Sequence, residues 1–378
     1  MHYTDEVEQF IKVLQDKSEV PNYFIQLFKC FEESNKGKKV GIVGDEFYSL
    51  YVRAFNLTPV LISGGSYYTG ENASHIFPQI SDPVAKSTLG LLLDKDLNLL
   101  EELCAVIITA SNDSYKKVIY YLQEQGVNVI KVDPPPYLLT KMPLSYVMFQ
   151  VSLLNEISKI RNTRMSYAVL QQELKGYQKA YELTKSPHWQ AIPTLVQNFF
   201  LQTLHMAKDK ETWCQQLQQY LHNIEPTPKP PTFLLVGSVL KFPSTKMYEI
   251  FNDIGITHFE NQCLGLPNFQ DIPDCKTSFG LLYECCKFQY DTACVAQTLV
   301  NSNNYDFTTD AQGIVYYLLK GQVAEAFEAE QLEKTAIKQS IPFLCIETDY
   351  TNTDKEQIKI RVEAFYEMLN KRAAVAIN

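Results

Sequence analysis

The sequence predicts an α/β protein with two doubly wound, Rossmann- or flavodoxin-like parallel sheets and a helical bridge between them. Three observations predict this class. Short apolar runs alternate with helical patterns in both the first and the last part of the chain. The runs are continuous, as in strands that are buried on both faces of a parallel sheet. Between the two alternating parts lies a long stretch without any strand pattern.

The first alternating part predicts an N-terminal α/β domain over residues 1–144. Apolar residues at helical spacing predict two helices over residues 5–35, with Pro21 between them. Strands and helices then follow in alternation. The predicted strands are Lys39–Val43, Val60–Ser63, Ala105–Thr109 and Val127–Val132, and the predicted helices are Glu46–Phe55 and Tyr115–Gln125.

The middle of the chain predicts the bridge. Residues 145–225 are rich in Gln, Leu and Tyr and carry only helical patterns. Residues 226–231 hold four prolines, which predicts a stiff linker. The second α/β domain then covers residues 232–378. Its predicted strands are Phe233–Val236, Thr257–Glu260, Ile314–Leu319 and Ile341–Glu347, and its predicted helices are Ser244–Ile254 and one after each of the last two strands. We expect a ligand cleft between the two domains.

Composition argues against several classes of function. A net charge of −9 argues against nucleic acid or an anionic membrane surface as the main partner. No apolar run approaches the roughly 18 residues that cross a membrane, and the N-terminus lacks the apolar centre of a signal peptide. The nine cysteines are scattered, as is typical of reduced thiols, and the six histidines form no ligand pair. We expect a cytoplasmic protein.

The closing part of the chain carries the most specific pattern. The strand at Ile341–Glu347 ends in Glu-Thr-Asp-Tyr, and a helix with Arg361 and Phe365 follows. Earlier, a strand, a Gly-Ser pair, a helix and a second strand lead to Cys263-x-Gly265. With these blocks the chain resembles the 2-hydroxyacyl-CoA dehydratase and benzoyl-CoA reductase family, in particular its 2-hydroxyglutaryl-CoA dehydratase D-component subunits.

The resemblance implies a radical chemistry and a cofactor. Family members hold a 4Fe-4S cluster on three cysteines at the carboxyl ends of strands. An ATP-driven activator passes an electron through this cluster, and the resulting ketyl radical of the substrate thioester expels a hydroxyl group as water. The positions of the three cysteines fall here on Asp82, Asn112 and Gln322. Iron–sulfur clusters need soft thiolates, so we expect this chain to hold no cluster and no other cofactor.

Further polar residues stand next to these three positions. Asp113 and Ser114 follow Asn112, and His75 precedes Asp82. One interpretation is that Asp113 and the side chains at the three positions meet at the cleft, hydrogen-bond one another and fill the space of the cluster. The alternative is a polar site for a small molecule, or for an ion such as Mg²⁺ or Ca²⁺ that prefers oxygen ligands.

Two other family features bear on the scaffold. The family carries a Pro-x-Glu-like sequence near the substrate at the start of its first helix, whereas Tyr48-Ser49-Leu50 stands there in this chain. At the other end, we expect Arg361 to pair with the acidic strand end at Glu347 and Asp349, and so to fix the last helix.

Five cysteines gather in the second domain. They are Cys263, Cys275, Cys285, Cys286 and Cys294. No Cys-x-x-Cys pair places two ligands on one turn, so we expect buried thiols that pack as small apolar residues. A relocated metal or cluster is the alternative.

The sequence thus supports one main hypothesis. The chain is a divergent, cluster-free family member that acts as a non-redox structural or regulatory subunit, a pseudoenzyme, in a homodimer or in a heterodimer with a related subunit. A first alternative is a working dehydratase subunit, a carbon–oxygen lyase for 2-hydroxyacyl-CoA, whose cluster and activator docking lie in its partner. A second is a protein that binds acyl-CoA or a similar metabolite in the polar cleft. The sequence leaves open whether the chain is an enzyme.

Overall fold

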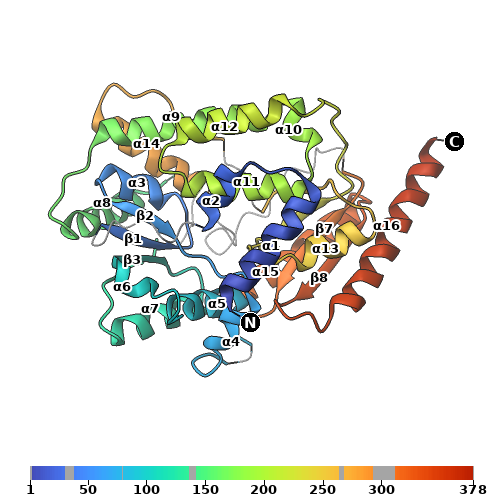
Figure 1. The fold of residues 1–378 in the computed structure, drawn as a ribbon, viewed down its shortest axis with the longest axis horizontal. Coiled ribbons are helices and arrows are strands. Elements are labelled where there is room, and N and C mark those ends of the chain that lie inside the picture. Colours follow the sequence, from blue (N-terminus) through green and yellow to red (C-terminus); the bar gives the residue numbers. More distant parts are fainter. Residues whose placement is uncertain are drawn as a thin grey trace.

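Two parallel sheets, one from each end of the chain, form the frame of the computed structural model (Figure 1). The structure describes residues 2–29, 38–78, 80–135, 142–263, 268–292 and 311–377. The first sheet has the order β2-β1-β3-β4, and the second has the matching order β6-β5-β7-β8. All of their strand pairs are parallel. The predicted fold class is therefore confirmed.

The strands lie close to their predicted places, with one exception. They are β1 (Lys39–Val43), β2 (Thr58–Leu61), β3 (Leu103–Thr109), β4 (Val129–Val132), β5 (Leu234–Gly237), β6 (Glu260–Asn261), β7 (Ile314–Leu319) and β8 (Phe343–Thr348). The strand predicted at Thr257–Glu260 is mostly wrong, because β6 begins only at Glu260. The carbonyl of Thr257 instead accepts from Thr194 in the bridge at 3.0 Å, outside any strand ladder.

The helices of the first half cover both faces of the first sheet. They are α1 (Tyr3–Lys17), α2 (Asn22–Lys29), α3 (Tyr48–Ala54), α4 (Tyr67–Asn72), α5 (Pro83–Leu92), α6 (Leu99–Glu102) and α7 (Asp113–Glu124). The sequence did not predict α4, α5 and α6. For α5 a start pattern was present, because Asp82 caps the helix and a proline occupies its first turn.

The bridge consists of helices only. They are α8 (Leu144–Lys159), α9 (Tyr167–Thr184), α10 (Pro187–Ala191), α11 (Thr194–Met206) and α12 (Lys210–His222). In Figure 1, α9, α12 and α10 run along the upper edge of the molecule, beside both halves. No helix within the described ranges combines the length and the apolar composition that a membrane crossing requires.

The second half adds the helices around the second sheet. They are α13 (Lys246–Asp253), the short 3-10 helix η1 (Phe269–Asp271), α14 (Ser278–Asp291), α15 (Val323–Lys338) and α16 (Lys355–Ile377). The pairing expected for Arg361 is not observed. Arg361 donates to the backbone carbonyl of Cys345 at 2.7 Å, and Asp349 pairs with Lys320 at 3.0 Å. The arginine therefore ties α16 to β8 through the backbone of the strand rather than through its acidic end.

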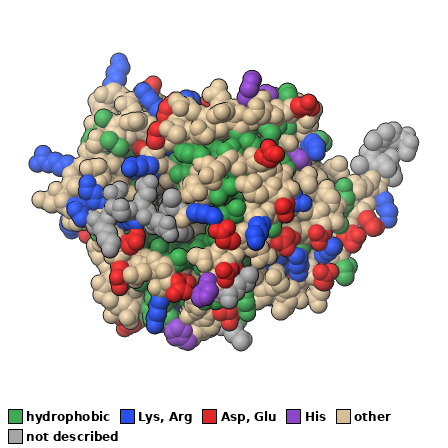
Figure 2. Space-filling model, viewed as in Figure 1, with side chains coloured by type: hydrophobic (Ala, Val, Ile, Leu, Met, Phe, Trp, Pro, Cys, Tyr) green, Lys and Arg blue, Asp and Glu red, His purple; other side chains and the backbone are tan. Residues whose placement is uncertain are grey.

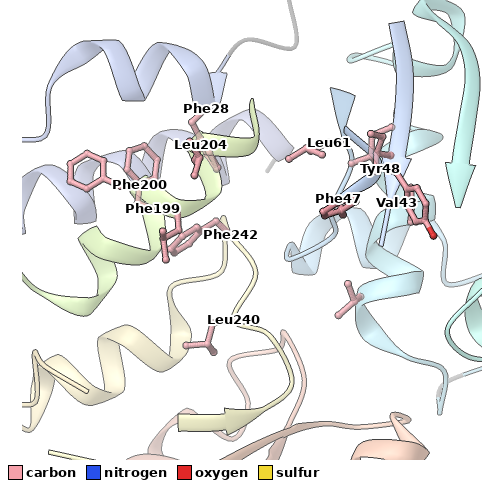
Figure 3. Packing of buried hydrophobic residues seen from close by; sticks show 14 of the residues in the cluster. Phe28, Val43, Phe47, Tyr48, Leu61, Phe199, Phe200, Leu204, Leu240 and Phe242 are labelled. Carbon is pink, nitrogen blue, oxygen red and sulfur yellow. The ribbon is translucent and has the colours of Figure 1, made fainter. Parts of the chain in front are cut away.

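One apolar core joins the N-terminal helices, the bridge and the second half. Phe10 of α1 lies 4.5 Å from Phe242, ring to ring, and 5.7 Å from Phe199 of α11. Figure 3 shows Phe199 of α11 beside Phe242, and the two rings lie 6.5 Å apart. Buried aromatic rings contribute strongly to stability, so these contacts hold the three parts of the chain together. A second, smaller core lies within the second half, between the second sheet and α15.

The surface shows no segregation of charge on the face drawn in Figure 2. Acidic and basic side chains are interspersed there over both halves. A nucleic-acid surface would gather lysines and arginines on one face. This face therefore gives no support to nucleic acid as a partner.

Candidate functional site

The carboxyl ends of both sheets line one cleft of about 1220 Å³. In doubly wound sheets, ligands bind outside the carboxyl ends of the strands, where the strand order reverses. That point lies between β1 and β3 in the first sheet, where Asp45 and Asn112 follow the strands. It lies between β5 and β7 in the second sheet, where Ser238 and Gln322 follow the strands. All four residues line the cleft.

A glycine with left-handed backbone ends the first strand of each sheet. Gly44 has φ +100° and Gly237 has φ +98°. A Cβ on Gly44 would lie 2.7 Å from the Cβ of Thr109, and one on Gly237 would lie 2.4 Å from the carbonyl oxygen of Tyr317. Only glycine fits both the backbone angle and the close approach. The two glycines thus bring the loop after each first strand against the end of the third strand.

Asp82, Asn112 and Gln322 meet beside this cleft, and we call them the Asp82 triad. The amide Nδ2 of Asn112 donates to Oδ2 of Asp82 at 2.7 Å, and Nε2 of Gln322 lies 3.2 Å from each carboxylate oxygen. Asp82 itself is only 1% exposed. Three residues that are far apart in the sequence are therefore in direct contact.

Each member of the triad stands at the start of a helix. Oδ1 of Asp82 accepts from a backbone N–H of α5 at 2.8 Å, and Oδ1 of Asn112 accepts from one of α7 at 3.1 Å. Gln322 precedes α15. The hydroxyl of Ser114 accepts from the backbone N–H of Asp82 at 3.2 Å. The helix starts fix the positions of the three side chains.

Ser238 completes the hydrogen bonding of the triad. Its hydroxyl donates to Oε1 of Gln322 at 2.5 Å and accepts from the backbone N–H of Leu319 at 3.0 Å. The amide of Gln322 is therefore hydrogen-bonded at both its oxygen and its nitrogen. Burial raises the pKa of the Asp82 carboxyl group, although hydrogen bonds from Asn112 and Gln322 act in the opposite direction.

The donor set of the triad does not fit an iron–sulfur cluster. Protein ligands of such clusters are chiefly cysteine thiolates. The triad offers one carboxylate and two amides, and these already hydrogen-bond one another. In the part of the chain that the structure describes, no group of three or more His, Cys, Asp or Glu side chains is placed to hold a metal ion.

The three neighbours that the sequence proposed for the cleft, His75, Asp113 and Ser114, do not line it, although Ser114 contacts the backbone of Asp82. His75 is exposed in the turn after α4. Asp113 is exposed at the start of α7 and pairs with Lys116 at 3.0 Å. The helical turn explains the difference, since Asn112 caps α7 toward Asp82 while Asp113 points to the surface.

The cysteines of the second half are spread over different environments. Cys285 and Cys286 are buried in α14, and burial raises the pKa of Cys286 to about 11. Cys263 lines the cleft, and burial raises its pKa as well. Cys275 lies just before α14. Gly265 and Cys294 lie outside the described residues. Among the described residues, these thiols do not form a group that is placed to hold a metal ion.

A second polar group, which the sequence did not single out, lies in the same cleft. Oε2 of Glu46 lies 3.2 Å from Nε2 of His205 in α11, and Oε1 accepts from Nζ of Lys241 at 3.3 Å. Nδ1 of His205 lies 3.0 Å from the hydroxyl of Tyr177 in α9. We call these four residues the Glu46 group. The group combines side chains from the first half, the bridge and the second half.

Burial and charge compete within the Glu46 group. Burial acts to raise the pKa of Glu46, but Lys241 and His205 outweigh it and the pKa is lowered. Burial lowers the pKa of His205 below 6.5, so its ring is neutral at pH 7. When its proton is on Nε2, the ring accepts at Nδ1 from the hydroxyl of Tyr177. The imidazole therefore lies between a hydroxyl at 3.0 Å and a carboxylate at 3.2 Å.

Asp45, next to Glu46, has no cation beside it. Its carboxylate accepts from the backbone N–H of Phe47 and from Nε2 of Gln289, each at 2.9 Å. Asp45 is open to the cleft. The protein atoms around its carboxyl group nevertheless exclude part of the water, and this desolvation raises the pKa of Asp45. Among the described residues, no Lys, Arg or His lies within ion-pair distance of it.

Two carboxyl groups thus lie just before α3. The resemblance to the family led us to expect a Pro-x-Glu-like sequence at the start of this helix, and the chain lacks that sequence. Asp45 and Glu46 follow the glycine that ends β1. Polar residues directly after a first parallel strand are a pattern that could have indicated them. His205 carried no such pattern, because it lies within a helix of the bridge and reaches Glu46 only through the fold.

Comparison with known families gives one match. A family model described as 2-hydroxyglutaryl-CoA dehydratase, D-component, matches residues 51–369. The match includes the whole Asp82 triad, whereas Asp45 and Glu46 lie just before it. No curated protein matches the chain at a significant level.

Proposed function

The chain belongs to the 2-hydroxyglutaryl-CoA dehydratase D-component family, and on that basis we propose that it is a cluster-free member. It acts as a non-redox structural or regulatory subunit beside a related chain. The Asp82 triad carries this proposal. A carboxylate and two amides at the former thiolate positions are poor ligands for iron in a cluster, and hydrogen bonds among them occupy the groups that would have to bind it.

Exposed apolar side chains on α8 and α14 support the proposal that this chain binds a partner chain. Leu144 and Met148 lie one turn apart on α8, and Phe279 and Tyr283 lie one turn apart on α14. Leu144 and Phe279 are each 74% exposed. The two helices contact each other, with Tyr146 of α8 against Tyr290 of α14, and exposed apolar side chains on neighbouring helices mark interaction sites. We propose that a related subunit, or a second copy in a homodimer, covers these side chains.

Anaerobic purification followed by iron and acid-labile sulfide analysis tests the cluster-free function. We expect far less than stoichiometric iron and no broad visible absorption from thiolate-to-iron charge transfer. Stoichiometric iron and sulfide with such a band would overturn the proposal. Analytical ultracentrifugation of the wild type and of Leu144→Lys/Phe279→Lys tests the partner surface, since the double variant should weaken self-association or capture of a cluster-bearing relative.

A second candidate function is the binding of a metabolite in the cleft. Its volume of about 1220 Å³ suffices for a small molecule, and the Glu46 group and Asp45 provide polar groups on its wall. A working dehydratase subunit would instead take a 2-hydroxyacyl-CoA here while its partner carried the cluster. Turnover of such a thioester that depends on this chain, measured with partner and activator present, would favour that lyase function over the non-redox one.

A further inference from the structure

The cleft carries a strong excess of negative charge. Six carboxyl side chains line it, against one lysine and one histidine. The carboxyl groups belong to Asp45, Glu46, Asp82, Glu260, Asp271 and Glu325. Lys241 and His205 both contact Glu46. Within the described ranges, the other five carboxyl groups have no cation at ion-pair distance.

Asp45 is the carboxyl group best placed to meet a ligand. Its two oxygens each accept one N–H from the protein, from Phe47 and from Gln289. A carboxylate can accept further hydrogen bonds, and Asp45 is open to the cleft. The Asp45 carboxylate is therefore accessible, and no cation of the described residues lies within ion-pair distance of it. A cationic ligand would supply a counter-charge.

An aromatic wall lines the cleft next to Asp45. The rings of Phe47 and Phe269 are stacked at 6.2 Å, those of Tyr177 and Phe269 at 4.7 Å, and Phe288 lies 5.0 Å from Phe269. All four residues line the cleft. Phe47 connects the aromatic wall with Asp45, because its ring is part of the wall and its backbone N–H donates to the Asp45 carboxylate. Aromatic faces attract organic cations as well as apolar groups.

An unpartnered acceptor lies in the same wall. Gln202 lines the cleft one turn before His205 on α11, is only 7% exposed, and its Oε1 has no hydrogen-bond partner. A buried acceptor without a donor costs free energy. A ligand that brings N–H donors to this wall would relieve the cost.

We propose that the cleft binds a small organic cation, a primary ammonium on an apolar body, with the ammonium at Asp45 and the body on the aromatic wall. This inference rests on the second candidate function, metabolite binding, and not on the absence of a cluster. It names a ligand class opposite in charge to an acyl-CoA. The phosphates of CoA would bring further negative charge to a cleft in which five carboxyl groups have no cation of the described residues at ion-pair distance.

Thermal unfolding and calorimetric titration of the purified chain test the inference, with 2-phenylethylammonium as the probe. We expect a saturable rise in Tm with this cation. Its neutral counterpart 2-phenylethanol, coenzyme A and MgCl₂ should give none. Asp45→Asn should weaken the affinity for the cation at least about tenfold. The matched control Asp113→Asn, on the exposed start of α7, should leave it unchanged.

A salt titration tests the same point without any variant. Raising NaCl from about 50 to 500 mM should weaken binding of the ammonium, because salt screens the charges of the cleft. Equal binding of the neutral alcohol, a rise in Tm with coenzyme A or MgCl₂, or no rise with the cation would each overturn the inference. The iron and sulfide analysis has an independent readout, so the two proposals fail separately.

Discussion

The side-chain amide of Gln322 donates to the carboxylate of Asp82 at 3.2 Å, and this hydrogen bond joins residues 240 positions apart. Gln322 follows β7 of the second sheet, and Asp82 starts α5 beside the first. Helices α5, α7 and α15 all begin at the triad. The positive ends of helix dipoles favour a negative charge. They therefore help to offset the cost of burying the Asp82 carboxylate between the two halves.

Asp82→Ala should lower the free energy of unfolding by about 2–4 kcal/mol. The loss of the helix cap accounts for about 1 kcal/mol, and the two amides left without an acceptor add about 1–3 kcal/mol. Urea denaturation at pH 7 measures the change. Asp209→Ala is the matched control, since Asp209 caps α12 at an exposed position without such amides and should cost only about 1 kcal/mol. Equal costs in both variants would show that the triad contributes nothing beyond the cap.

Restoring thiolates at the triad should create an iron–sulfur site. Because the three side chains are in contact, the variant Asp82→Cys/Asn112→Cys/Gln322→Cys places three soft ligands together. After anaerobic reconstitution with iron and sulfide, we expect a broad visible absorption that the wild type lacks. The control Asn112→Cys/Asp113→Cys/Gln322→Cys has as many new thiols but places one on the surface. A similar spectrum from both variants would contradict the assignment of the three positions.

Glu46→Gln should destabilise the protein at pH 7 but not in acid. Lys241 and His205 keep the pKa of folded Glu46 below 4.5 despite burial. Its ionised contacts therefore stabilise the fold above the unfolded pKa, and this contribution is lost as the pH falls through the folded pKa. Charge-assisted hydrogen bonds predict a cost of about 1.5–3 kcal/mol at pH 7. Urea denaturation over a pH series checks this, with Glu71→Gln as the control that should show no such trend, because Glu71 is exposed on α4 and forms no ion pair with the described residues.

Asp45→Asn should have the opposite pH dependence. Desolvation raises the pKa of folded Asp45 above 3.8, so the folded state holds its proton where the unfolded chain has lost it. The contribution of Asp45 to stability therefore falls as the pH rises through that window. The free energy of unfolding of the variant, minus that of the wild type, should grow as the pH rises from 3.8 through the raised pKa of folded Asp45. A decrease over this range would indicate that a cation of the protein pairs with Asp45.

Gly90→Ala should destabilise the protein by about 3 kcal/mol or more. Gly90 lies in α5, and a Cβ there would stand 1.6 Å from the carbonyl oxygen of Thr69 in α4. The backbones of the two helices would have to separate. Gly70→Ala in α4 is the matched control, because its Cβ would meet only Ser87, at 4.0 Å. The control should be neutral or stabilising by about 0.5–1 kcal/mol, and thermal unfolding compares the two.

Much of the fold could be predicted from the sequence because buried parallel strands are continuous apolar runs. β7 lies at its predicted residues, Ile314–Leu319, for this reason. The strand predicted around Thr257 was mostly wrong, because a local apolar pattern does not show which backbone group will hydrogen-bond with a given carbonyl. The backbone N–H of Thr194, in the bridge, donates to the carbonyl of Thr257.

The site could be predicted only where a position had a counterpart in the family. Asp82, Asn112 and Gln322 were found by their alignment with cysteines, and the structure places them in contact. Their hydrogen-bond geometry could not be predicted, because it depends on how three helix starts are oriented. His205 and Lys241 could not be linked to Glu46 from the sequence, since chain folding alone brings α11 and the loop after β5 to the end of β1.

The two glycines at the strand ends show that both sheets approach the cleft in the same way. Gly44 and Gly237 share a backbone angle, a place at the end of the first strand, and a close contact with the third strand of sheets that have the same strand order. Asn112 and Gln322 likewise follow the third strand of each sheet. The two amides that bond Asp82 therefore occupy equivalent positions, so each sheet contributes one donor to the carboxylate from the matching place.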